Sequence, residues 1–354
     1  MKQISIQSQI FEYPVIFEKD LSARLKELNK KNKLHILIDK SVWIFYKELF
    51  DINKYASLKV FDPVEDKKNI SEIASYIEFL LNHKIHKDHK LLVIGGGLVQ
   101  DIGSFTAHIL FRGIDWIFIP TTLLAMADSC VGSKSGINVG KYKNQIGSFH
   151  PPVKIFIYLP FLDTLPQAEM INGVGEIIKH ALIKGSEAFN FFNKNIDHLG
   201  KDKKITEEII YKSLLIKKEI VEEDEFEKNI RKVLNYGHTF GHALEGYTRH
   251  KIPHGIGVLI GMDIANYISV KKEILSLVDF TKIHDLIIRY TKSYEVELKD
   301  YDNYMDFLLH DKKVIGNEVY AILSKGIGKI EIMKTKVDFQ LKNYIKEYFI
   351  KFVN

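Results

Sequence analysis

The chain has 354 residues, of which 46% are hydrophobic and 27% charged, with a formal net charge of +5. This length allows two domains around substantial cores, and the composition is that of an ordinary globular protein. The single cysteine, Cys130, excludes an intramolecular disulfide framework. The mild net charge does not indicate a nucleic-acid partner. The sequence contains no run of about 18 apolar residues, which a membrane-spanning helix would need. We therefore expect a soluble cytoplasmic protein, and a small anionic substrate accounts for the modest basic excess as well as nucleic acid would.

The first half alternates short apolar runs with amphipathic stretches. The apolar runs cover residues 34–39, 90–94 and 116–122, and helix-like stretches cover 70–83 and 101–110. Continuous apolar strands separated by helices are typical of a parallel α/β sheet. We predict a Rossmann-like α/β domain over residues 1–165, with ligands bound where the strands end.

A glycine triplet, Gly95-Gly96-Gly97, follows the second apolar run and precedes a helix that contains Asp101. Glycines let the backbone approach a pyrophosphate, and a helix N-terminus favours its negative charge. The triplet lacks the Gly-x-Gly-x-x-Gly spacing of the common dinucleotide-binding turn. On its own it indicates either an anion site or only a turn.

Residues 128–144 contain Asp128, Lys134, Lys143 and Asn144 among glycines. We expect this segment to be rich in loops. Lysines beside backbone amides make good phosphate contacts, whereas a solvated loop is the alternative interpretation.

From residue 166 the pattern changes to long helical segments, which predicts a mostly α-helical domain over residues 166–354. Glu176 lies among apolar neighbours, with Lys179 one helical turn later. A carboxylate in such surroundings must be paired or must coordinate a cation. The stretch 341–354 has the apolar spacing of an amphipathic helix that packs on the core or on a dimer partner.

Three histidines, His238, His242 and His254, lie close together in this second half. In a helix, His238 and His242 would share one face, and imidazoles with a carboxylate form catalytic zinc sites. Thr239 stands where a zinc-protease helix needs glutamate, so that motif is excluded.

Taken in order, these segments resemble the 3-dehydroquinate synthase family of sugar phosphate cyclases. The resemblance runs from about Asp39 to Lys313 and rests on specific motifs. They are Gly-Gly-Gly-x-x-x-Asp, Arg-Gly, Pro-Thr-Thr-Leu-Leu, Asp-Ser-x-Val-Gly-x-Lys, Lys-Asn-x-Ile-Gly, Gly-x-x-Glu-x-Ile-Lys, Leu-Asn-x-Gly-His-Thr-Phe-Gly-His, His-Gly and Asp-Lys-Lys.

The resemblance implies a fold with an NAD-binding domain followed by a helical metal-binding domain. It implies zinc, with cobalt as the alternative, held by Glu176, His238 and His254, while His242 transfers protons beside the metal. The positions matching the family's NAD site are Asp39, Glu65, Lys68, Gly96, Gly97, Asp101, Thr121, Thr122, Leu124, Asp128, Ser129, Lys134, Lys143, Thr164 and Leu165.

The substrate implied by the resemblance is a seven-carbon 2-keto acid phosphate. The matching positions are Lys134, Asn144, Lys179, Lys217, Arg231, Asn235, His242 and Lys313. Of these, the resemblance implies catalytic roles for Lys134, Lys179, Lys217, Arg231, Asn235 and His242. Lys217 and Arg231 match the positions that hold the substrate carboxylate. Arg112 matches a residue that reaches across from a second subunit, so we expect a homodimer.

The implied reaction eliminates phosphate and closes a ring by an aldol step, with NAD regenerated. Five residues depart from the usual motifs, namely Gln100, Cys130, Ser133, Tyr142 and Ile256. They leave open a cyclase for another sugar phosphate, such as sedoheptulose 7-phosphate. A metal-dependent alcohol dehydrogenase of related fold and a non-enzymatic metal-binding protein are the remaining alternatives.

Overall fold

The structure is a computed structural model that describes residues 2–30, 33–140, 142–249, 251–294, 296–309, 314–315 and 318–352. The chain divides into two compact units. The first contains Met1–Pro166 and Lys217–Phe226, and the second contains Gln167–Ile216 and Glu227–Asn354. Within the described residues, no helix is both long enough and apolar enough to cross a membrane.

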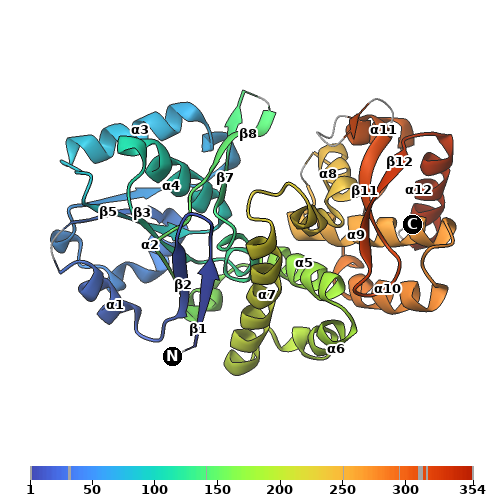
Figure 1. Cartoon of the computed structure of the whole chain (residues 1–354), viewed down its shortest axis with the longest axis horizontal. Coiled ribbons are helices and arrows are strands. Elements are labelled where there is room, and N and C mark those ends of the chain that lie inside the picture. Colours follow the sequence, from blue (N-terminus) through green and yellow to red (C-terminus); the bar gives the residue numbers. More distant parts are fainter. Residues whose placement is uncertain are drawn as a thin grey trace. The chain divides into compact units, whose positions relative to one another are not determined.

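The first unit is built on a seven-stranded sheet with the order β1-β2-β9-β6-β5-β3-β4 (Figure 1). Only the β1–β2 pair is antiparallel. The strands are β1 (Gln3–Gln7), β2 (Glu12–Phe17), β3 (Leu34–Asp39), β4 (Ser57–Phe61), β5 (Lys90–Gly95), β6 (Trp116–Pro120) and β9 (Lys154–Ile157). The predicted parallel α/β sheet is confirmed, because the apolar runs form strands covered on both faces.

Four helices accompany this sheet, namely α1 (Leu21–Leu28), α2 (Lys40–Tyr46), α3 (Ile70–Asn82) and α4 (Gly97–Ile109). In Figure 1, α3 and α4 lie on one side of the sheet and α1 on the other. Asn69 caps α3 by accepting a hydrogen bond from the Glu72 amide. The register pairs Ile94 with both Ile38 and Ile119, so β3, β5 and β6 end at the same edge.

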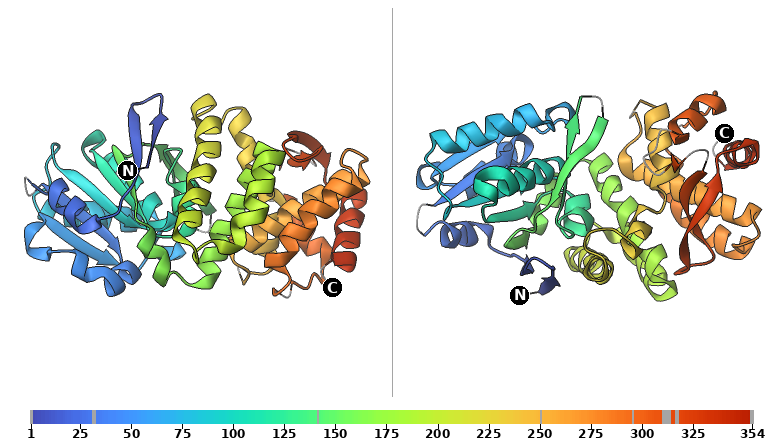
Figure 2. Two further views of the ribbon diagram at one scale, coloured as in Figure 1. Left: turned by 90° about the horizontal axis from the view of Figure 1, so that it is seen from below. Right: turned by 45° about the horizontal axis from the view of Figure 1, so that its top comes forward.

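A two-stranded hairpin of β7 (Lys134–Val139) and β8 (Tyr142–Phe149) completes the first unit and is the pair of green strands in the right-hand view of Figure 2. The expectation of a loop-rich segment over residues 128–144 is therefore wrong. A π-helical turn, Ala125–Ser129, precedes the hairpin. The strand pairing satisfies backbone groups of a segment whose side chains in β8 are mostly exposed.

The second unit is mostly helical, as predicted. Its helices are α5 (Gln167–Lys184), α6 (Ser186–Asn195), α7 (Lys203–Glu223, grouped with the first unit from Lys217), α8 (His238–Tyr247), α9 (His254–Lys271), α10 (Leu277–Thr291), α11 (Tyr301–Leu309) and α12 (Phe339–Phe352). A small antiparallel sheet of β10 (Val314–Ile315), β11 (Glu318–Ser324) and β12 (Ile330–Lys336) is added to them.

Helix α9 is the centre of the second unit. Its residues from Gly255 to Ser269 are all buried, because α5, α8, α10, α12 and β11 pack around it. A helix that is buried on every side must be apolar all round, and the α9 sequence has that property. Its first residue, His254, lies at one end of this buried axis.

Residues 217–226 return to the first unit through polar contacts. Glu225 accepts hydrogen bonds from the Ser8 hydroxyl and the Gln9 amide, both at 2.6 Å. Glu222 accepts one from the Gln7 amide at 2.6 Å. Our prediction of one boundary after residue 165 did not include this return, which depends on side chains far apart in the sequence.

Candidate functional site

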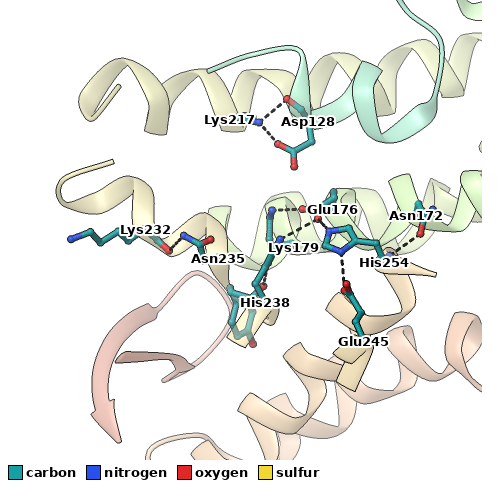
Figure 3. A network of polar contacts seen from close by, with 12 residues as sticks. Asp128, Asn172, Glu176, Lys179, Lys217, Lys232, Asn235, His238, Glu245 and His254 are labelled. Carbon is teal, nitrogen blue, oxygen red and sulfur yellow. Dashed lines mark hydrogen bonds and ion pairs between the residues drawn. The ribbon is translucent and has the colours of Figure 1, made fainter. Parts of the chain in front are cut away.

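Glu176, His238 and His254 come together from three helices of the second unit (Figure 3). Glu176 lies within α5, while His238 and His254 are the first residues of α8 and α9. Oε1 of Glu176 is 3.5 Å from Nε2 of His238 and 3.3 Å from Nε2 of His254. These are the three residues expected to hold the metal.

The spacing of these atoms suits a metal ion. Ligand atoms about 2.1 Å from a tetrahedral zinc lie roughly 3.4 Å from one another, and the two measured separations from Glu176 bracket that value. Two imidazole nitrogens and one carboxylate oxygen also leave a fourth position open, as in catalytic zinc sites.

Each of these three residues has a glycine as its neighbour in the sequence. Each of these glycines lies where two helices approach closely. A Cβ on Gly175 would lie 2.6 Å from the Gly255 carbonyl oxygen, and one on Gly255 would lie 2.5 Å from the Asn172 Cα. Gly237 has a φ of +81°, and a Cβ on it would lie 2.5 Å from the Val258 carbonyl oxygen. The glycines thus allow α5, α8 and α9 to pack closely enough for the side chains to meet.

The ring orientation of both histidines is set by a hydrogen bond at Nδ1. His238 Nδ1 lies 3.3 Å from the Tyr236 carbonyl oxygen, and His254 Nδ1 lies 2.9 Å from Oε1 of Glu245. Both rings therefore turn Nε2 toward Glu176. The roles of the two nitrogens follow from these acceptors, because a carbonyl or carboxylate oxygen requires N–H at Nδ1.

The two histidines differ in their affinity for protons. Burial lowers the pKa of His238 well below its ordinary value, despite the opposing charge of Glu176. Burial also disfavours protonated His254, but its hydrogen bonds to Glu176 and Glu245 outweigh burial and raise its pKa to about 10. A cation bound here must therefore displace a proton from His254.

Lys179 and His242 lie close to the same cluster. Lys179 is buried and pairs with Oε2 of Glu176, the oxygen opposite the one that faces the histidines. The His242 ring centroid is 5.2 Å from that of His238 and 6.0 Å from that of His254. His242, Glu245 and His254 form a second set whose candidate ligand atoms lie within 4.8 Å of one another.

The other predicted substrate residues of the second unit have separate surroundings. Arg231 is buried, and Asn235 donates hydrogen bonds to Glu227 Oε1 at 2.8 Å and to the Lys232 carbonyl at 3.2 Å. Both belong to the turn Ile230–Asn235 that precedes α8. Lys313 lies outside the described residues.

In the first unit, the glycine turn opens directly onto the N-terminus of α4. Gly96 precedes the helix and Gly97 is its first residue. The nearest atom to a Cβ on Gly97 would be Ser129 Oγ, at 4.0 Å, so the backbone there is open to a ligand. A Cβ on Gly96 would instead meet Thr122 Cγ2 at 2.9 Å. This arrangement fits a bound pyrophosphate.

Several predicted cofactor residues share one polar network around Lys68. This buried lysine donates to Asp101 Oδ2 at 3.0 Å and to Asn144 Oδ1 at 2.8 Å, and lies 3.7 Å from Glu65 Oε1. Asp101 also accepts from the Gly136 amide at 3.1 Å. Asn144, predicted for substrate, thus joins residues predicted for NAD.

Lys217 contacts Asp128 within the same unit, as Figure 3 shows. Its ammonium group pairs with the Asp128 carboxylate and donates to the Asp128 carbonyl oxygen at 2.7 Å. Lys217 was expected to bind substrate and Asp128 to bind NAD, and the structure joins them. Lys134 and Lys143 are exposed on β7 and β8.

The remaining predicted positions of the first unit are at strand ends and turns. Asp39 ends β3 and accepts from the Ser41 amide, and burial raises the pKa of its carboxyl group. Thr121, Thr122 and Leu124 follow β6, and Thr122 Oγ1 accepts from the Ala125 amide at 3.2 Å. The Thr164 hydroxyl is 3.0 Å from that of Tyr46, and Leu165 follows it.

Arg112 lies on an unusual turn. Phe111 and Arg112 have φ angles of +51° and +59°, and Gly113 follows at +103°. Left-handed backbone costs free energy in non-glycine residues, and such strained residues cluster at functional sites in proteins. Lys87 donates to the Phe111 carbonyl oxygen at 3.0 Å, and Arg112 is exposed.

Sequence reasoning missed one polar residue that contacts the predicted site, Glu245, and assigned no role to a second, Gln100. Glu245 shares the helical face of His238 and His242, at spacings of seven and three residues, so its position could have been read from α8 alone. Gln100 exchanges two hydrogen bonds with Ser129, at 2.7 and 2.6 Å. Only its departure from the family motif drew attention to Gln100.

Comparisons with known proteins match both halves of the chain. The family model described as 3-dehydroquinate synthase N-terminal matches residues 59–172, and the one described as 3-dehydroquinate synthase C-terminal matches residues 173–314. The 3-dehydroquinate synthase of Dictyoglomus thermophilum is 34% identical over 345 residues, which cover 94% of this chain and 95% of that protein.

Two solved structures have a similar fold. One is 2-deoxy-scyllo-inosose synthase in complex with carbaglucose-6-phosphate, NAD+ and Co2+, with a TM-score of 0.86, 24% identity and coverage of 98% of this chain and 99% of that one. The other is 2-epi-5-epi-valiolone synthase from Streptomyces hygroscopicus with NAD+ and Zn2+, with a TM-score of 0.84, 22% identity and coverage of 97% and 98%. By its matches to both family models and to its relatives, the chain belongs to the 3-dehydroquinate synthase family.

Proposed function

We propose that this protein is a 3-dehydroquinate synthase of the shikimate pathway. It would convert 3-deoxy-D-arabino-heptulosonate 7-phosphate into 3-dehydroquinate by eliminating phosphate and closing a carbocycle. The observation that carries the proposal is the approach of Nε2 of His238 and of His254 to one oxygen of Glu176, at 3.5 and 3.3 Å. It occurs in a chain whose relatives of that name match over nearly its whole length.

The metal would be zinc, held by Glu176, His238 and His254. The donor set and its spacing support zinc, and the open fourth position would take a substrate hydroxyl. Cobalt is the alternative, since nitrogen and oxygen ligands alone discriminate weakly between such ions. Structures of similar fold contain Zn2+ or Co2+.

NAD would bind to the first unit, with its pyrophosphate at Gly96 and Gly97. The open space at Gly97 and the start of α4 support this placement. The remaining residues that we assign to NAD are Asp39, Glu65, Lys68, Asp101, Thr121, Thr122, Leu124, Asp128, Ser129, Lys134, Lys143, Thr164 and Leu165.

When bound, NAD would remove and return a hydride at one ring carbon, and zinc would polarise the alcohol there. The chain's own residues would position the substrate and move its protons. Lys134, Asn144, Lys179, Asn235 and Lys313 would hold its phosphate and hydroxyls. Lys217 and Arg231 would hold its carboxylate, and His242 would transfer protons. Such preorganised cations stabilise charge as it develops during phosphate loss.

The protein would work as a homodimer in the cytoplasm. The strained turn at Phe111 and Arg112 supports the dimer, because it presents an exposed guanidinium group that a partner's substrate could contact. Sedimentation analysis of the purified chain tests the oligomeric state, and a monomer at working concentrations would contradict this part of the proposal.

Phosphate release tests the activity. The purified chain is supplied with zinc and NAD and offered the heptulosonate phosphate, and NADH absorbance is followed in parallel. We expect phosphate release that stops when zinc is chelated, without net accumulation of NADH. Accumulation of NADH would indicate a dehydrogenase, and no phosphate release from this substrate would refute the proposal.

A second candidate is a cyclase for another sugar phosphate. It is favoured by the family departures at Gln100, Tyr142 and Ile256, and in this structure Ile256 is fully buried beside His254. A substrate panel that includes sedoheptulose 7-phosphate separates the two candidates. The heptulosonate phosphate should give the highest kcat/KM if the first proposal holds.

A further inference from the structure

His254 lies between two carboxylates, one at each ring nitrogen. Nε2 faces Oε1 of Glu176 at 3.3 Å, and Nδ1 faces Oε1 of Glu245 at 2.9 Å. The side chains of Glu245 and His254 are 12% and 34% exposed, so the carboxylate is the better shielded partner of this contact. Figure 3 shows Glu245 approaching His254 from the side opposite Glu176.

The two separations have different meanings. A distance of 3.3 Å leaves room for a metal ion between the two ligand atoms, because ligand atoms of a tetrahedral zinc lie roughly 3.4 Å apart. A distance of 2.9 Å is that of an N–H···O hydrogen bond. Glu245 therefore acts as an acceptor from the His254 ring in this geometry, although it also belongs to the set His242, Glu245 and His254.

The fold makes space for this hydrogen bond at a specific residue. A Cβ on Gly257, one turn after His254 in α9, would lie 2.9 Å from Oε1 and 3.1 Å from Cγ of Glu245. A larger residue would displace the carboxylate from the histidine. Gly257 thus leaves room for the Glu245 carboxylate. It also lies where α8 approaches α9 closely, since a Cβ on Gly241 would meet the Gly257 carbonyl oxygen at 2.6 Å.

We propose that Glu245 is a positioning residue for the metal, which holds His254 in the tautomer that turns its Nε2 lone pair toward the ion. A carboxylate that accepts from the remote nitrogen of a metal-bound imidazole fixes the ring orientation and raises the basicity of the ligating nitrogen. His238 has only a neutral carbonyl oxygen in the equivalent place, at 3.3 Å. The inference rests on the proposed metal site but not on the substrate.

Zinc affinity of the full chain, measured by competition with a chelator without NAD or substrate, tests the proposal. Glu245→Ala should bind zinc about 10–100-fold more weakly than the wild type. Glu245→Gln keeps an acceptor oxygen without the charge and should lie between the two. Glu187→Gln, an exposed acid-to-amide change on α6, is the matched control and should bind as the wild type does.

A second variant guards against a simple folding defect. Gly257→Ala retains Glu245 but crowds its carboxylate, so it should weaken zinc binding in the same direction. Circular dichroism melting of the metal-free variants separates loss of affinity from loss of fold. His242→Ala should leave zinc affinity unchanged, because His242 is not in the proposed ligand set.

Two results would overturn the proposal. One is wild-type zinc affinity in a folded Glu245→Ala. The other is two zinc ions per wild-type chain with one lost in Glu245→Ala, which would make Glu245 a ligand of a second ion. Failure of the wild type to release phosphate from the heptulosonate phosphate would refute the proposed activity, while the zinc measurements would still decide the role of Glu245.

Discussion

Lys179 pairs with Oε2 of Glu176, while Oε1 of the same carboxylate faces Nε2 of both His238 and His254. The side chains of Glu176 and Lys179 are only 2% and 3% exposed. One buried carboxylate thus has a permanent cation on one oxygen and a place for a metal ion on the other. The pairing allows Glu176 to stay ionised in surroundings that would otherwise disfavour its charge.

Replacement of Lys179 by methionine should destabilise the metal-free protein. Removal of one partner of a buried ion pair costs about 3–5 kcal/mol, because the remaining charge loses its compensation. Zinc would restore part of that compensation, so its addition should stabilise Lys179→Met more than the wild type. Urea unfolding with and without zinc measures both effects. An equal gain from zinc in the two proteins would contradict this account of the pair.

His254→Ala should lose most of its zinc, whereas His242→Ala should retain it. The reason is that His254 Nε2 lies 3.3 Å from Glu176 Oε1, while His242 is outside the set formed by Glu176, His238 and His254. Metal analysis after dialysis checks the prediction. Zinc loss in His242→Ala with retention in His254→Ala would reverse the assignment of the ligands. Phosphate release should fall in both variants, since His242 is proposed to move protons.

The sequence predicted the features that residue type and apolar runs encode. The parallel strands ending at Asp39, Gly95 and Pro120 follow from continuous apolar runs. The glycines beside Glu176, His238 and His254 can also be read from the sequence, but their packing role depends on which helices contact one another. No local pattern states that Gly175 meets Gly255, because that contact joins residues eighty positions apart.

The hairpin β7–β8 could not be predicted for a related reason. The β8 side chains from Tyr142 to Gly147 are exposed, so the strand has no alternation of apolar and polar residues to mark it. Similarly, residues 217–226 join the first unit through Lys217 and Asp128 and through Glu225 and Ser8, contacts that bridge long sequence separations. Glu245, by contrast, could have been found from helical spacing alone.

Gln100→Ala should weaken NAD binding. Gln100 is buried and exchanges two hydrogen bonds with Ser129, whose hydroxyl is the nearest atom to the open side of Gly97. The two hydrogen bonds contribute about 1 kcal/mol each, so an affinity loss of up to roughly thirtyfold is expected. Alanine avoids the additional cost of about 1 kcal/mol for a glycine inside α4. Titration with NAD measures the change.

A double-mutant cycle controls this experiment. If Gln100 acts by holding Ser129, then Ser129→Ala and Gln100→Ala should not be additive, and the double variant should bind NAD about as weakly as either single variant. Full additivity would mean that Gln100 acts elsewhere. If Gln100→Ala bound NAD as tightly as the wild type, this departure from the family motif would have no role in NAD binding.

Acid should destabilise the first unit through His35. This residue is fully buried on β3, with Nδ1 2.8 Å from Ser57 Oγ and Nε2 2.9 Å from His89 Nδ1, and burial and the neighbouring histidines lower its pKa to about 4. The unfolded chain takes up this proton near pH 6.5 and the folded chain only near pH 4, so stability falls as the pH drops between these values. The loss of unfolding free energy from this group approaches about 3 kcal/mol at pH 4, at about 1.4 kcal/mol per pH unit.

Urea unfolding between pH 7 and pH 5 should show a shallower decline in the free energy of unfolding for His35→Asn than for the wild type, with His198→Asn as an exposed histidine control. Parallel declines in His35→Asn and the wild type would assign the acid sensitivity to other groups.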